Sequence, residues 1–150
     1  MADGIQKKLR AGLAQLLHDA GAVTWVASGA IDPAASPPPL VDQVLPDSPD
    51  VCAALATYCT GEDEPTLSGS VLMLQVRTRA GITNLAAGDD LDDAISQELM
   101  GNWPLTLAND VRVTSLVRAS GSPIGRDPAG RMERTTNYRV RIHDPGPYRG

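Results

Sequence analysis

Three polar residues of this chain have the types and the order that a metal-dependent nuclease uses. Such enzymes place an acid, then an acid or an amide, then a basic residue on paired strands, and Asp50, Gln75 and Arg77 follow this order. The side-chain oxygen atoms of Asp50 and Gln75 are the kind of ligand that Mg²⁺ prefers. Gln75 and Arg77 also fit the solvent-facing side of a single strand. A small metal-dependent nuclease is therefore one open alternative.

No other group of residues has the spacing of a catalytic or metal site. His18 and His143 have no Cys, His, Asp or Glu at metal-ligand spacing. In the segment GSPIG, Pro123 stands where a nucleophile elbow needs serine, so we interpret Ser122 as a turn residue. We therefore predict no catalytic residue, no metal and no cofactor.

Two runs of carboxylates stand out from the rest of the sequence. They consist of Glu62, Asp63 and Glu64, and of Asp89, Asp90, Asp92 and Asp93. Neither run has the spacing of a calcium-binding loop with its downstream glutamate. We interpret the first as a solvated turn and the second as a helix start, where acidic residues favour the positive end of the helix dipole.

The basic residues gather in residues 120–140, which hold four arginines, two prolines and three glycines. This composition predicts a turn-rich loop between two strands. The loop could bind an anion, line a pocket or dock onto a neighbouring copy of the chain. In the simpler alternative, its arginines pair with Asp127 and Glu133 within the loop itself.

The size and charge of the chain limit its function. Its 150 residues are enough for one domain with one core, and 13 basic against 18 acidic residues give a formal charge of 13 − 18 = −5. Such a charge argues against broad affinity for nucleic acid. Cys52 and Cys59 are read as buried thiols rather than a disulfide, and no apolar run reaches the length of a membrane span. We expect a soluble protein made in the cytoplasm.

Hydrophobic periodicity predicts one α+β domain with a single sheet. Helices are expected at 3–20, with Asp3 as N-cap and Gly21 as the stop, and at 91–100. Strands are expected at 23–28, 41–45, 70–81, 104–107, 111–120 and 136–143. The segment 48–61 has helical spacing when it is considered alone.

The alternation of side chains predicts which face of each strand is buried. The expected core positions are Leu72, Leu74, Val76, Val111, Val113, Val117, Tyr138, Val140 and Ile142. On the same argument, we expect Arg77 and Arg79 to emerge into solvent.

Four ordered blocks carry a resemblance to a known family. They are LPDSPDVCAALATY, VLMLQVRTRAG, DDLDDAISQELMG and VRASGSPIGRDPAGRMERTTNYRVRIH. Together they resemble, over residues 40–145, the tail terminator (minor capsid, head-tail joining) proteins of long-tailed bacteriophages, particularly those that infect actinobacteria. The matching positions are Pro46, Asp47, Pro49, Asp50, Arg77, Arg79, Gly125, Arg126, Asp127, Gly130, Arg131, Glu133, Arg134, Asn137 and Tyr138. The segment AGITNLAAGDD is less polar than the family's pattern.

The resemblance implies a fold and a role. It implies a single domain with a mixed, mostly antiparallel sheet flanked by two helices, in which residues 50–58 form a strand; residues 145–150 are a possible flexible end. The implied protein is a structural virion protein, made in the host cytoplasm, that forms a ring, usually a hexamer, at the head-tail junction. It would cap the tail tube and meet the head-completion proteins, while DNA passes through the lumen without specific binding and no membrane is involved. A different neck or head-completion connector is the nearest alternative.

If the protein forms such a ring, its charged residues have expected roles. We expect intersubunit or partner contacts from Arg77, Arg79, Arg126, Asp127, Arg131, Glu133 and Arg134. We expect the two carboxylate runs at the lumen or a ring face, because an arginine-lined bore would hold the phosphates of a moving genome.

Overall fold

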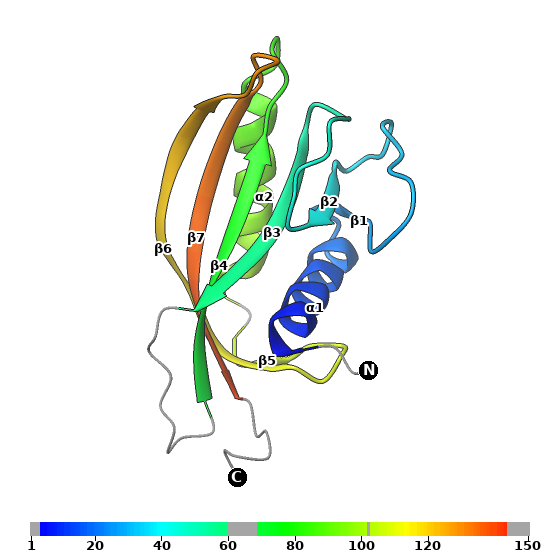
Figure 1. Ribbon diagram of the computed structural model, residues 1–150. Helices are drawn as coiled ribbons and strands as arrows, with labels where there is room; N and C mark the ends of the chain where they lie inside the picture. The colour runs from blue at the N-terminus through cyan, green and yellow to red at the C-terminus, as the bar shows by residue number, and fades with distance from the viewer. Residues whose placement is uncertain (1–3, 60–68, 102, 144–150) are drawn as a thin grey trace.

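The strands of the chain join into one sheet in the computed structural model, which describes residues 4–59, 69–101 and 103–143, with only the backbone of Gly69 and Ser70. In chain order, the elements are α1 Ile5–Asp19, β1 Thr24–Trp25, β2 Pro39–Asp42, β3 Cys52–Cys59, β4 Gly69–Arg79, α2 Ala86–Leu99, β5 Leu105–Thr106, β6 Arg112–Arg126 and β7 Met132–His143. The strand order is β1-β2-β3-β4-β7-β6-β5 (Figure 1). Strands β1, β2 and β3 run parallel to one another, and the other pairs are antiparallel. The expected mixed, mostly antiparallel α+β fold is confirmed.

Both helices cover the same face of the sheet. The apolar stripes of α1 and α2 and the inward side chains of the central strands form one buried cluster. Its helical members include Leu9, Leu13 and Leu17 from α1 and Leu91, Ile95 and Leu99 from α2. The predicted inward residues of β4 and β7 all belong to it, and Tyr138, Val140 and Ile142 are fully buried. Neither of the two helices in the described residues lies on the opposite face of the sheet.

Helix α1 ends where the sequence predicts. The N–H of Gly21 bonds to the carbonyl of His18 and the N–H of Ala22 to that of Leu17, each at 3.0 Å. This pair of bonds is the Schellman motif, which needs a left-handed residue, and Gly21 has a φ of +81°. The predicted N-cap, Asp3, lies outside the described residues.

Arg10 is a buried cation that the sequence pattern does not reveal. It lies on the sheet side of α1, where its Nε is 2.6 Å from Oδ1 of Asp42. Its Nη1 also donates to the hydroxyl of Thr57 at 2.7 Å. The guanidinium therefore ties α1 to β2 and β3.

The predicted boundaries of α2 and β2 need correction. Helix α2 begins at Ala86, not 91, so Asp89 and Asp90 lie inside it rather than before it. Only Asp89 lies in its first turn. Strand β2 covers Pro39–Asp42 instead of 41–45, because it pairs with β3 through Leu40, Val41 and Asp42.

Residues 52–59 form strand β3, as the family resemblance implies, and not the helix that their local spacing suggests. Backbone partners on both sides explain the outcome, since β3 pairs with β2 and with β4. Cys52 is buried, but Cys59 at the other end of the strand is exposed, which corrects the expectation that both thiols are buried.

Strand β6 contains three β-bulges that change its faces. Its pairing with β7 shifts between Val113 and Ser115, between Arg118 and Ser120, and between Pro123 and Gly125. The first shift moves Leu116 into the core and turns Val117 outward, with 49% of its surface exposed. The prediction that Val117 is buried is therefore wrong.

No helix among the described residues is long and apolar enough to cross a membrane.

Candidate functional site

The arginine-rich stretch is mostly strand rather than loop. Strand β6 continues to Arg126 and β7 begins at Met132, so only residues 127–131 form the tip of a long hairpin. Ser122 consequently lies in a strand and not in a turn. The N–H of Gly130 closes the tip by donating to the Asp127 carbonyl at 2.9 Å, and Gly130 has a left-handed φ of +86°. The order Asp-Pro-Ala-Gly is the one that a tight turn of this kind favours.

Arg131 holds this tip to a distant loop. Its Nε lies 2.8 Å from Oδ2 of Asp127 across the turn. Its Nη1 lies 3.2 Å from Oδ1 of Asp50 and also donates to the carbonyl of Asp47. The side chain is only 12% exposed. A cation so enclosed fixes the hairpin tip against the segment that precedes β3.

Arg79 also holds the segment that precedes β3. Although the alternation of β4 predicts an exposed side chain, Arg79 is only 3% exposed. Its guanidinium donates to the carbonyls of Pro46, Pro49 and Asp50, at 2.6, 2.8 and 2.9 Å. These three carbonyls accept hydrogen bonds from the buried guanidinium and so compensate its charge.

Electrostatics at the tip follow from these bonds. Burial alone would raise the pKa of Asp127, but hydrogen bonds from the backbone and guanidinium of Arg131 outweigh it and hold that pKa below its usual value. Burial raises the pKa of the thiol of Cys52, the first residue of β3, to about 11. Cys52 is therefore a protonated, unreactive thiol at neutral pH.

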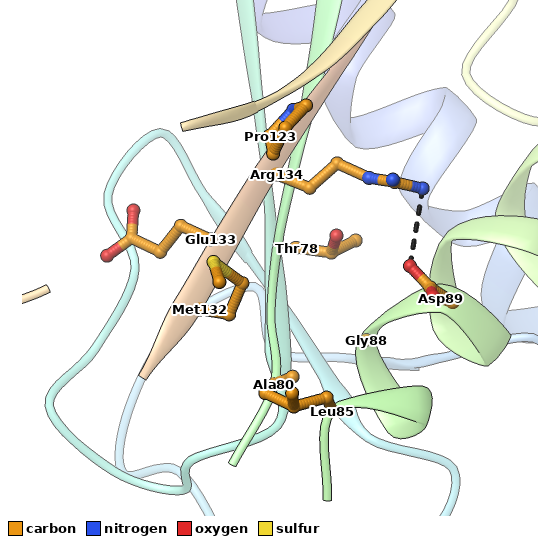
Figure 2. A pocket seen from close by; sticks show the side chains of 9 residues that line it. All are labelled: Thr78, Ala80, Leu85, Gly88, Asp89, Pro123, Met132, Glu133 and Arg134. Carbon is orange, nitrogen blue, oxygen red and sulfur yellow. Dashed lines mark ion pairs between the residues drawn. The ribbon is translucent and has the colours of Figure 1, made fainter. Parts of the chain in front are cut away.

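A hollow opens beside the tip, between the start of α2 and β7 (Figure 2). Thr78, Leu85, Met132 and Arg134 are among the residues that line it. At its rim, Nη1 of Arg134 lies 3.2 Å from Oδ1 of Asp89, which links the hairpin to the first turn of α2. Ala80, Leu85, Pro123 and Met132 give it apolar walls, and Thr78 and Glu133 are its other polar residues.

A row of polar contacts continues between α2 and the hairpin. The Thr136 hydroxyl donates to Oδ1 of Asp92 at 2.8 Å, in a buried position. Arg118 donates to the Ser96 hydroxyl. The hydroxyl of Tyr138 is buried nearby without a hydrogen-bond partner in the described part of the chain, and burial raises its pKa.

The family model described as Bacteriophage tail terminator protein matches residues 16–144. The chain belongs to this tail terminator family. It is therefore a structural protein of the phage tail or virion. No curated protein matches the sequence.

A solved structure shares the fold of this tail terminator. One chain of the virion of a native gene transfer agent (GTA) particle superposes with a TM-score of 0.57 at 18% identity. The match covers 94% of the present chain and 86% of the other chain. The likeness extends over nearly the whole domain.

In this tail terminator, the two most specific family-like blocks meet in space. The block LPDSPD forms the segment before β3. The block PIGRDPAGR forms the end of β6 and the hairpin tip, and Arg131 fixes this tip to the LPDSPD segment. The sequence indicated both blocks but not their contact, because no local pattern records which distant carbonyls an arginine meets.

The other charged residues that were expected at interfaces or in the lumen lie outside the contact that Arg131 and Arg79 make. Arg126 is exposed and donates to the carbonyl of Gly130 at 2.8 Å, while Nε of Arg77 lies 3.9 Å from a carboxylate oxygen of Glu133. On α2, Asp90 and Asp93 are exposed. The run Glu62, Asp63 and Glu64 lies outside the described residues.

The three residues of the nuclease alternative bond to other partners. Asp50 accepts from Arg131, Gln75 lies within 3.4 Å of Asn137, and Arg77 faces Glu133. The described part of the chain contains no group of three His, Cys, Asp or Glu side chains placed to hold a metal ion.

Charge is segregated between the elements. Helix α2 carries five acidic and no basic residues, whereas β4, β6 and β7 together carry eight arginines and one glutamate. The chain therefore combines one acidic helix with three strands rich in arginine.

Proposed function

We propose that this protein caps the phage tail tube, ends its polymerisation and forms the interface to the head-completion proteins. Membership of the tail terminator family over residues 16–144 carries the proposal. The work is structural and involves no catalysis. The protein would be made in the host cytoplasm and would act in the virion at the head-tail junction.

The active form in this proposal is a ring of identical copies, most simply a hexamer. A closed ring needs a heterologous contact, in which one patch of each copy meets a different patch of the next. The segregated charge supports such a contact, because an acidic helix and basic strands lie on the same chain. The tail tube protein and a head-completion or stopper protein are the further partners.

Phage DNA would pass through the ring without specific binding. A bore that binds phosphate through many arginines would retain the moving genome. We therefore place the acidic side of α2, with Asp90 and Asp93, toward the bore or a ring face. The exposed Arg126, at the end of β6 next to the hairpin tip, would point toward a partner protein.

The test is a phage that lacks this gene, observed by electron microscopy with and without complementation. Loss of a terminator should give tails of uncontrolled length that fail to join heads, and complementation should restore both length and joining. Tails of normal length beside unjoined, filled heads would instead indicate a head-completion connector. Normal, infectious particles would refute both roles.

A further inference from the structure

A β-bulge near the end of β6 holds the side chain of Ile124 in solvent. The pairing of β6 with β7 shifts between Pro123 and Gly125, so Ile124 between them is the extra residue. Its side chain is 50% exposed, and Gly125 has a φ of +119°, a conformation that favours glycine. Bulges re-aim side chains, and a bulge that only protected the edge from pairing would need no large apolar residue. Ile124 is therefore a candidate contact residue.

Arg126 places a cation next to this apolar side chain. Its Nη1 donates to the carbonyl of Gly130 at 2.8 Å, which ties the side chain to the hairpin tip. The residue is exposed, and no carboxylate of the described residues forms an ion pair with it. A guanidinium has several further N–H donors, which remain available to a carboxylate. The end of β6 thus presents an isoleucine and an arginine two residues apart.

An apolar groove with one carboxylate opens between the end of α1 and the first half of α2. Its volume is about 340 Å³. The residues that line it include Ala22 after α1, Pro37 and Pro38 before β2, and Ala87, Leu91 and Ala94 of α2. Asp90 is the only charged residue of the described lining; it is exposed, and no cation of the described residues forms an ion pair with it. The groove is therefore suited to an aliphatic side chain that has a cation beside it.

The end of β6 and the groove lie on different sides of the chain. In Figure 1, β6 and β7 lie to one side of α2, whereas α1 and β2 lie to the other. In a closed ring, each copy uses one patch toward the preceding copy and a different patch toward the next. The two features meet this requirement, because the apolar side chain and cation of one match the apolar walls and carboxylate of the other.

We propose that Ile124 of one copy enters the groove between α1 and α2 of the next copy, with the Arg126 guanidinium meeting the Asp90 carboxylate. Burial of the isoleucine would supply most of the affinity, and the exposed ion pair would mainly fix the orientation. This contact rests on the ring of the proposed function. It assigns Asp90 to the seam between copies, while Asp93, about one helical turn further on, stays available to the bore.

Cross-linking in assembled particles tests the geometry. In a Cys59→Ser background, Ser122→Cys and Ala20→Cys place thiols at exposed positions near Ile124 and beside the groove, without filling either. Particles with both substitutions in one chain should give a ladder of covalent multimers with a short bismaleimide, and each single variant should stay monomeric. A double variant without a ladder overturns the proposal. A double variant that stops at dimers also overturns it, since that result would mean a reciprocal contact between two copies.

Ile124→Ser tests the apolar part of the contact. It should lower the cross-linked fraction at least about tenfold, because the burial of an isoleucine is worth more than a tenfold change in an equilibrium constant. Val117→Ser is the matched control, since Val117 lies on the same strand with 49% of its surface exposed, and it should leave cross-linking unchanged. Ala94→Leu should block the groove and lower the fraction without any change in β6. Equal cross-linking in the Ile124→Ser and Val117→Ser variants contradicts the proposal.

Charge reversal tests the ion pair. Arg126→Glu and Asp90→Arg should each lower the cross-linked fraction at least about fivefold, because each brings like charges together, and the two changes combined should restore it. Arg112→Glu, at the other end of β6, is the control and should leave cross-linking unchanged. If the combined reversal does not restore cross-linking, Arg126 does not meet Asp90 and the proposed orientation is wrong.

Tail length separates the two proposals. If complemented tails have normal length but no ladder forms, the contact is wrong and the terminator function stands. If loss of the gene leaves tails unchanged, the terminator function fails, and the cross-linking result still reports on the contact between copies.

Discussion

Tyr138 fills the centre of the core, and its hydroxyl has no hydrogen-bond partner in the described residues. We predict that Tyr138→Ala lowers the free energy of unfolding by about 3–5 kcal/mol, because it leaves a cavity. Tyr138→Phe should change it by less than about 1 kcal/mol, since only an unbonded hydroxyl is lost. Urea unfolding at pH 7 measures both. A phenylalanine variant as unstable as the alanine variant would show that the hydroxyl is bonded in solution.

Asp127 should make the hairpin tip sensitive to acid. Its pKa is lower in the folded chain than its ordinary value, so its contribution to stability is present above pH 4 and is lost as pH falls through the folded pKa. Asp127→Asn keeps an acceptor for the turn but removes the charge. We expect the urea midpoint of this variant to depend less on pH, from about pH 4 downward, than that of the unmodified chain. Parallel midpoints across that range would contradict the assignment.

At the scale of elements, Arg79 joins β4 to the segment before β3. Arg79→Met should lower the free energy of unfolding by about 2–4 kcal/mol, because three carbonyls lose their buried donor. Arg79→Lys should recover little, since an ammonium cannot reproduce the planar fork. The control is Arg77→Met on the same strand, whose side chain is 43% exposed and whose loss should cost under about 1 kcal/mol. Urea unfolding measures both variants. If Arg77→Met and Arg79→Met lose the same free energy of unfolding, Arg79 does not anchor the segment before β3.

Elements with a clear period were predictable from sequence, and those shaped by distant partners were not. Helix α1 and strands β4 and β7 have regular apolar spacing, and the structure places their predicted core residues inward. Strand β3 has helical spacing but takes its conformation from two neighbouring strands. The bulge that turns Val117 outward depends on how β6 matches β7, and a sequence pattern does not record that match.

The sequence indicated which residues form the candidate site, but it did not predict how they contact one another. The family-like blocks include Asp50, Arg79 and Arg131 among their matching positions, yet only the fold brings these three together. The prediction that Arg79 emerges into solvent failed because alternation along β4 takes no account of the loop that covers its end.

At the scale of the whole molecule, net charge governs the relation to DNA. With a formal charge of −5, the isolated protein should not bind duplex DNA measurably at about 0.15 M salt, because its arginines are offset by carboxylates and several are internally bonded. Fluorescence anisotropy of a labelled duplex at two salt concentrations tests this. Tight, salt-sensitive binding would refute the proposed conduit.

Arg126 and Arg131 should respond differently to truncation. Arg126→Ala should leave stability within about 0.5 kcal/mol of the starting value but reduce tail joining in complementation, because its exposed side chain is free to meet a partner protein. Arg131→Ala should also destabilise the fold, since it removes the link between hairpin tip and loop. Normal joining by a folded Arg126→Ala protein would exclude this arginine from the interface.

The position of β7 has a consequence for biosynthesis. This strand is the last described element to be translated, yet it lies between β4 and β6 and carries Tyr138 into the core. While the ribosome is still making the preceding residues, β4 has no antiparallel neighbour on one side and the core lacks its largest side chain. A prematurely terminated chain therefore lacks the middle of its sheet rather than an edge. Unfinished copies would fail to fold and would be exposed to proteolysis, so only complete chains would enter an assembling particle.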